Sequence, residues 1–148
     1  MRIAIDGPSG AGKSTIARRI AACYNLMYLD TGAMYRAIGL AALRAGVDVR
    51  DAEAVAGFVQ QVDMCVRYID GAQHVFLSDE DVSDQIRTQQ VAMAASAVSA
   101  VPQVRLKLVQ LQRETAGRDG AVLDGRDIGT YVLPDAEFKF FLTADASE

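Results

Sequence analysis

Three short apolar runs, each ending on an aspartate, dominate the hydrophobic pattern of the chain. They are Arg2–Asp6, Met27–Asp30 and Ala121–Asp124. Continuous apolar runs of this length are typical of strands buried on both faces of a parallel sheet. A glycine-containing segment and then a helix-like stretch follow each run, which predicts strand–loop–helix units and an α/β fold. A fourth strand is predicted at Glu137–Leu142.

Five segments carry the apolar spacing or the end signals of helices. Thr88 suits an N-cap, Pro102 suits a first helical turn, and Gly46 suits a helix stop. Helical spacing after Ile16 and Ile20 also predicts that Cys23 lies in the core. The predicted helices are Ser14–Tyr24, Ala33–Arg44, Ala52–Gln60, Thr88–Ser99 and Pro102–Thr115.

An alternating pattern between these helices predicts a small antiparallel β insert. Apolar side chains alternate from Val62 to Tyr68, Asp70-Gly71 suits a two-residue hairpin turn, and His74–Leu77 returns as a second strand. His74, the only histidine, has no second metal ligand near it in the sequence, so we expect a solvated residue. The acidic run Asp79–Asp81 is interpreted as a solvated loop rather than a calcium site.

Composition narrows the class of protein. A chain of 148 residues, 51% of them hydrophobic, is consistent with one domain spanning residues 1–148. There is no apolar run long enough for a bilayer and no signal-peptide pattern, so we expect a cytoplasmic protein without a membrane partner. The net charge of -4 argues against general nucleic-acid binding. The two cysteines lack zinc-ligand spacing and suggest no disulfide framework.

The strongest motif lies directly between the first predicted strand and the first predicted helix. Residues 7–14 read GPSGAGKS and match the phosphate-loop pattern GxxxxGK[ST]. Glycines let successive backbone N–H groups and a helix N-terminus approach phosphate oxygens closely. The lysine adds a positive charge for the β- and γ-phosphates, and the serine hydroxyl suits Mg²⁺. The predicted ATP-binding residues are Gly7, Pro8, Ser9, Gly10, Ala11, Gly12, Lys13, Ser14 and Thr15.

The aspartates that end the first three strands point to the same region. Ligands of open α/β sheets bind beyond the carboxyl ends of the strands, where Asp6, Asp30 and Asp124 are expected to gather. A single aspartate at the end of a strand is explained by the preference of turns for aspartate, but three together favour a ligand-binding site. A GTPase switch is excluded by the absence of an NKxD segment, since the only asparagine, Asn25, precedes Leu26.

Five motifs make the chain resemble the cytidylate kinase family over nearly its whole length. They are IDGPSGAGKST at 5–15, YLDTGAMYRA at 28–37, VFLSDEDVSDQIRT at 75–88, ASAVSAVPQVR at 95–105 and LDGRDIGT at 123–130. The resemblance implies a three-layer P-loop fold with a five-stranded parallel sheet flanked by helices. It also implies an inserted monophosphate-binding segment at 62–86, and Mg²⁺-dependent phosphate transfer from ATP to CMP or dCMP.

The resemblance further implies roles for individual residues. The catalytic residues are expected to be Lys13, Arg36 and Arg126, with both arginines at the acceptor phosphate. Magnesium is expected on Ser14 directly and on Asp30 and Asp124 through water. The acceptor nucleotide is expected to contact Thr31, Tyr35, Arg36, Ser96, Arg105, Arg126 and Asp127.

The resemblance implies that Ser96, Arg105 and Asp127 read the base, and the last two of these suit cytosine chemically. Cytosine offers an amino donor beside two acceptors, which matches the carboxylate of Asp127 and the guanidinium of Arg105. Uracil presents a carbonyl instead of the amino group, so CMP and dCMP are predicted over UMP. Taken singly, Arg105 could be a solvated or salt-bridged helix residue, and Arg126-Asp127 a local ion pair.

Two other functions are compatible with the phosphate loop. The alternatives are a different small-molecule P-loop kinase and a nucleotide-binding module without turnover. Members of the family continue beyond the equivalent of Glu148 with an arginine-rich lid, a further strand and a helix, so the resemblance implies a truncated chain. The family protein is expected to be a monomer, whereas the exposed edge at 137–142 in this chain favours self-association.

Overall fold

A computed structural model describes residues 1–8 and 10–144, apart from the side chains of Arg118 and Asp119. The chain divides into two compact units, each of which is described by itself. Residues 1–31 and 110–148 form the first unit, and residues 32–109 form the second. The boundaries fall after the first residue of α2 (Thr31–Arg44) and within α5 (Pro102–Asp119).

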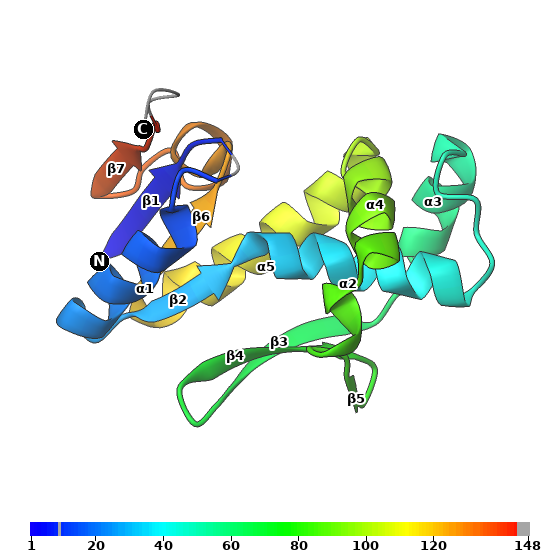
Figure 1. Cartoon of the computed structure of the whole chain (residues 1–148), viewed down its shortest axis with the longest axis horizontal. Helices are drawn as coiled ribbons and strands as arrows, with labels where there is room; N and C mark the ends of the chain where they lie inside the picture. Colours follow the sequence, from blue (N-terminus) through cyan, green and yellow to red (C-terminus); the bar gives the residue numbers. More distant parts are fainter. Residues whose placement is uncertain (9, 145–148) are drawn as a thin grey trace. The chain divides into compact units, whose positions relative to one another are not determined.

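The first unit contains a parallel four-stranded sheet with the strand order β2-β6-β1-β7 (Figure 1). This arrangement confirms the predicted α/β class. The strands β1 and β2 have the predicted bounds, β6 is one residue longer, and β7 is shorter than its predicted range. The strands are β1 (Arg2–Asp6), β2 (Met27–Asp30), β6 (Ala121–Gly125) and β7 (Phe138–Phe141).

Helix α1 (Lys13–Tyr24) packs on one face of this sheet through two alanines. Ala17 and Ala21 form a buried cluster with Ile3, Ile5 and Val122. The predicted core position of Cys23 is wrong, because its side chain is exposed. A helix turns about 100° per residue, so a position two residues after Ala21 faces nearly the opposite way.

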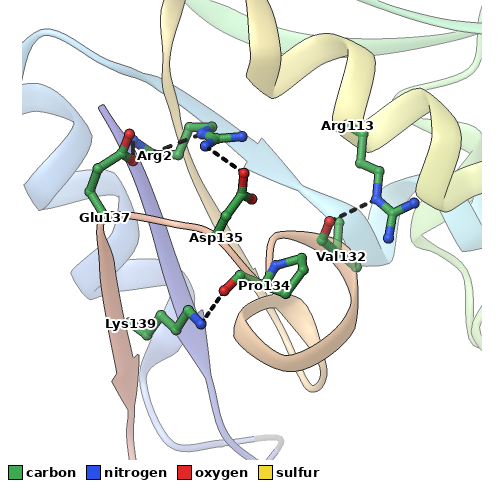
Figure 2. Close-up of polar contacts among 7 residues, drawn as sticks. All are labelled: Arg2, Arg113, Val132, Pro134, Asp135, Glu137 and Lys139. Carbon is green, nitrogen blue, oxygen red and sulfur yellow. Dashed lines mark hydrogen bonds and ion pairs between the residues drawn. The ribbon is translucent and has the colours of Figure 1, made fainter.

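Polar contacts fasten the segment between β6 and β7 (Figure 2). The guanidinium of Arg113 on α5 donates to the carbonyls of Val132 and Tyr131, both at 2.8 Å, and these residues belong to the short π-helical turn η2 (Ile128–Val132). Arg2 at the start of β1 pairs with Asp135 at 3.2 Å and also with Glu137. Both ends of the segment that leads into β7 are therefore held.

The second unit consists of helices and a three-stranded antiparallel sheet with the order β3-β4-β5. Thr88 accepts a hydrogen bond from the Val91 backbone N–H, which confirms it as the N-cap of α4. A Cβ added to Gly39 of α2 would lie 2.9 Å from the backbone nitrogen of Ala95, so only glycine permits this close approach of α2 and α4. The remaining elements are α3 (Ala52–Val59), β3 (Met64–Ile69), β4 (Ala72–Leu77), β5 (Glu80–Asp81), η1 (Gln85–Arg87) and α4 (Gln89–Val98).

The hairpin is confirmed, with its turn residues Asp70 and Gly71 at φ 54° and 79°. Glu80 and Asp81 are exposed, as predicted, but they form strand β5 against the end of β4 rather than a loop. Glu80 accepts two hydrogen bonds from Arg44, at 2.8 and 3.1 Å. His74 lies in strand β4 of the hairpin, as predicted, but it is only partly exposed, and its Nδ1 lies 2.6 Å from Asp81. Strand β5 has only two residues, too few to form an alternating pattern.

Candidate functional site

The phosphate loop has the backbone that its glycines predict. Gly7, Gly10 and Gly12 have φ values of 151°, 83° and 83°. Side chains rarely adopt these conformations, and a Cβ on Gly7 would lie 2.3 Å from the carbonyl oxygen of Leu142. The predicted ATP-binding residue Ser9 lies outside the described residues. The chain from Gly10 therefore enters α1 through backbone angles that favour glycine.

The N-terminus of α1 is suited to an anion. Gly12 occupies the N-cap position, no described side chain caps the helix there, and its first turn contains no acidic residue. The first N–H groups of a helix lack intrahelical partners and carry a partial positive charge, which attracts phosphate. The side chains of Ser14 and Thr15 in this turn are exposed. Lys13 folds back over the loop, with Nζ donating to the carbonyl oxygen of Pro8 at 2.9 Å.

Two of the three strand-end aspartates share one face of the sheet. Asp30 pairs with Asp124 in the register of β2 and β6, and Asp124 pairs with Ile5 of β1. Ile5 belongs to the cluster that α1 covers, so both carboxylates lie on the α1 side. Lys13 is close enough to lower the pKa of Asp124. The structure thus brings Lys13 of the phosphate loop close to the face that carries Asp30 and Asp124.

Asp6 departs from the expected gathering. It follows Ile5 directly, so its side chain points to the opposite face of the sheet. There its carboxylate is buried and accepts hydrogen bonds from the backbone N–H groups of Ile128 and Gly129, at 2.7 and 2.8 Å. Asp6 ends β1 at the predicted edge, but it anchors the backbone of η2 and does not face Asp30 and Asp124.

Tyr28 is a polar neighbour of Asp124 that sequence reasoning missed. Its hydroxyl donates to Asp124 Oδ2 at 2.9 Å, and Arg18 lies over its ring, 5.5 Å from the centroid. Burial and then the charge of Asp30 raise the pKa of Asp124 to about 6, while the Tyr28 hydrogen bond acts in the opposite direction. Burial raises the pKa of Tyr28 as well, so its hydroxyl remains a donor. Its position two residues before Asp30, on the same face of β2, was the available signal.

The oxygens in this region suit Mg²⁺. A serine hydroxyl and two carboxylates are hard donors, and Mg²⁺ is usually held by one or two carboxylates together with substrate phosphates and waters. No cluster of three or more histidine, cysteine or acidic side chains that could hold a metal occurs in the described part of the chain. A hydroxyl and two carboxylates fit an ion that is also held by the phosphates of a nucleotide triphosphate.

The residues predicted for the acceptor nucleotide are divided between the two units. In the first unit, Thr31 is buried and donates its hydroxyl hydrogen to the backbone carbonyl of Asp124 at 2.8 Å. Arg126 is exposed after β6, and Asp127 is partly buried directly before η2. In the second unit, Ser96 is exposed on α4, whereas Tyr35 and Arg36 on α2 and Arg105 on α5 are partly buried. Their assembly into one site stays a prediction.

A glycine loop between a central parallel strand and a helix, with a lysine and strand-end carboxylates beside it, defines a P-loop nucleotide-binding protein. Comparison with known sequences narrows the class. The family profile described as "Cytidylate kinase" matches residues 3–148. The chain belongs to the cytidylate kinase family, which confirms the resemblance seen in its motifs.

Curated relatives carry the same name. The chain is 50% identical over 148 residues to the cytidylate kinase of Desulfitobacterium hafniense, covering all of this chain and 63% of the relative. It is 54% identical over 145 residues to that of Mycolicibacterium paratuberculosis, covering 97% of this chain and 64% of the relative. It is 54% identical over 143 residues to that of Mycobacterium leprae, covering 96% and 62%. The chain therefore spans less than two thirds of these relatives' length.

Proposed function

We propose that the protein transfers the γ-phosphate of ATP to CMP or dCMP, giving CDP or dCDP. The observation that carries the proposal is the glycine-built loop at the N-terminus of α1, with Lys13 folded over it and Asp30 and Asp124 on the same side of the sheet. The name of the relatives supports the choice of acceptor. ATP and CMP or dCMP are thus the proposed partners, with a monomer as the proposed state of the family's full-length protein.

The proposed chemistry is electrostatic. Phosphoryl transfer needs donor and acceptor held in line and the charge on the transferring group neutralised, with little covalent help from protein. Backbone N–H groups of residues 7–14 would hold the ATP phosphates, and Lys13 would neutralise the β- and γ-phosphates. Arg36 and Arg126 would hold the acceptor phosphate as planar bidentate donors. Mg²⁺, which supplies positive charge between the phosphates, would be held by Ser14 and, through water, by Asp30 and Asp124.

The base-reading residues would give the preference for cytosine. Asp127 would accept from the cytosine amino group, Arg105 and Ser96 would contact the acceptor side of the base, and Thr31 and Tyr35 would line the same pocket. With UMP, the carboxylate would face a carbonyl, and an unmatched buried polar pair can cost a large discrimination factor. Equal turnover of CMP and UMP would contradict this assignment.

A kinase assay with CMP, dCMP, UMP, AMP and shikimate tests the function. It should be run on this chain and on a version extended to the length of its relatives, with Lys13→Ala in both. We expect turnover of CMP and dCMP, loss of turnover in Lys13→Ala, and CMP binding largely unchanged in that variant. Turnover of another acceptor would identify a different small-molecule kinase, and nucleotide binding without turnover in either length would identify a binding module.

The proposed location is the cytoplasm, where ATP and nucleoside monophosphates are available together. No helix within the described residues is both long and apolar enough to cross a membrane.

A further inference from the structure

Tyr28 contacts the carboxylate of Asp124 from the strand that also carries Asp30. The two residues lie two positions apart on β2, so their side chains project from the same face of the sheet, and Asp30 pairs directly with Asp124. From this position the Tyr28 hydroxyl reaches Asp124 Oδ2 at 2.9 Å, in a partly buried setting. This hydrogen bond joins the neighbouring strands β2 and β6 near the carboxyl ends of the strands, and the phosphate loop begins at the carboxyl end of β1.

Other contacts hold both ends of this hydrogen bond. Arg18 of α1 lies over the Tyr28 ring, 5.5 Å from its centroid, which connects the tyrosine to the helix that follows the phosphate loop. At the other end, Thr31 donates to the backbone carbonyl of Asp124 at 2.8 Å. The Asp124 side chain is buried, with 7% of its residue surface exposed. Thr31 therefore fixes the backbone of Asp124, and Tyr28 fixes the orientation of its carboxylate.

We infer that Tyr28 is a positioning residue for the magnesium–nucleotide site, acting through Asp124. The inference rests on the proposed function, in which Asp124 contacts the magnesium ion through water. The hydroxyl occupies Oδ2, and a carboxylate has a second oxygen with which to accept from a magnesium-bound water. Removing a residue that orients a carboxylate beside a metal ion typically lowers the metal affinity by about 10–100-fold.

The test is Tyr28→Phe, which removes the hydroxyl and keeps the ring under Arg18. Calorimetry would measure ATP binding to the chain twice, with excess Mg²⁺ and with a chelator. We expect the variant to bind ATP with Mg²⁺ about tenfold more weakly than the native chain, and ATP alone equally well. A purely structural role of the tyrosine would weaken both measurements together. Tyr24→Phe, at an exposed tyrosine of α1, is the matched control and should change neither.

A double-mutant cycle with Asp124→Asn tests whether Tyr28 acts through Asp124. If it does, Tyr28→Phe has no further effect on Mg²⁺-dependent ATP binding in the Asp124→Asn chain. Additive effects in the double variant, or equal Mg²⁺-dependent binding by native and Tyr28→Phe chains, would overturn the inference while leaving the proposed function intact. Failure of the native chain and its extended version to bind ATP with Mg²⁺ would overturn the proposed function itself.

Discussion

Asp6 should be one of the most important single side chains for the stability of the first unit. Its buried carboxylate accepts two backbone hydrogen bonds, at 2.7 Å from Ile128 and at 2.8 Å from Gly129. A hydrogen bond to a charged group contributes about 1.5–3 kcal/mol, and a buried N–H left without a partner costs about 1–3 kcal/mol. We therefore expect Asp6→Ala to lower the free energy of unfolding by about 3–5 kcal/mol, allowing for partial entry of water.

Urea unfolding followed by circular dichroism measures this loss. With a slope of about 2 kcal/mol per molar urea, the midpoint should fall by about 2 M. Because domains are stable by only about 5–15 kcal/mol, Asp6→Asn provides a milder variant that keeps one acceptor oxygen and should lose about half as much. Asp79→Ala, in the exposed turn before β5, is the control and should leave the midpoint unchanged. Equal midpoints for Asp6→Ala and Asp79→Ala would refute the reasoning.

Three further predictions follow from the first unit. Gly7→Ala should cost about 2–4 kcal/mol in urea unfolding, because the new Cβ would lie 2.3 Å from the carbonyl oxygen of Leu142 at a φ of 151°; Gly57→Ala, with nothing within 4 Å in α3, should be neutral or stabilising. Because the pKa of Asp124 is raised to about 6, the folded chain favours the protonated form of this carboxyl. The contribution of Asp124 to stability is therefore fully present below its ordinary pKa near 4 and is lost as pH rises through 6. Without Mg²⁺, Asp124→Asn should therefore be more stable than the native chain by about 2–3 kcal/mol at about pH 7 and equally stable at about pH 4. A difference in stability that stays constant across this pH range would show that the ionisation of Asp124 is not its cause. Strand β7 forms an edge of the sheet and its side chains are exposed, including Phe140 at 48%, so the chain should self-associate in sedimentation experiments. Phe140→Lys should reduce this association, whereas Tyr24→Lys should not. A native chain that stays monomeric at all concentrations would count against the prediction.

The local elements of the site could be predicted because their signals are contiguous in the sequence. GPSGAGKS requires both a particular backbone and a helix after it, and the structure has positive φ at Gly7, Gly10 and Gly12 followed by α1. The ends of β1 and β2 were equally accessible, since the apolar run of each stops at an aspartate. The end of α5 was missed although a signal existed: the helix continues to Asp119, and Gly120 follows with a φ of 81°.

The remaining features depend on contacts between distant parts of the chain. The face of the sheet on which Asp6 lies follows from the register that pairs Ile5 with Asp124, and a single sequence does not specify that register. Cys23 was misplaced because α1 buries small alanines while Ile16 remains 39% exposed. The partners of His74 and Glu80 come from a two-residue strand and from the end of α2. These pairings had no local pattern to indicate them.

The end of β1 connects the two loops that the proposed reaction needs. Gly7, the first residue of the phosphate loop, donates its backbone N–H to the carbonyl of Gly125 at 3.2 Å, and Asp6 holds the N–H groups of Ile128 and Gly129. Arg126 and Asp127, the proposed acceptor residues of this unit, lie between those anchored positions. The segment that would hold the acceptor is thus fixed to the strand that leads into the ATP loop. A change at Asp6 should consequently weaken CMP binding as well as stability, although Asp6 faces away from the carboxylates of the magnesium side.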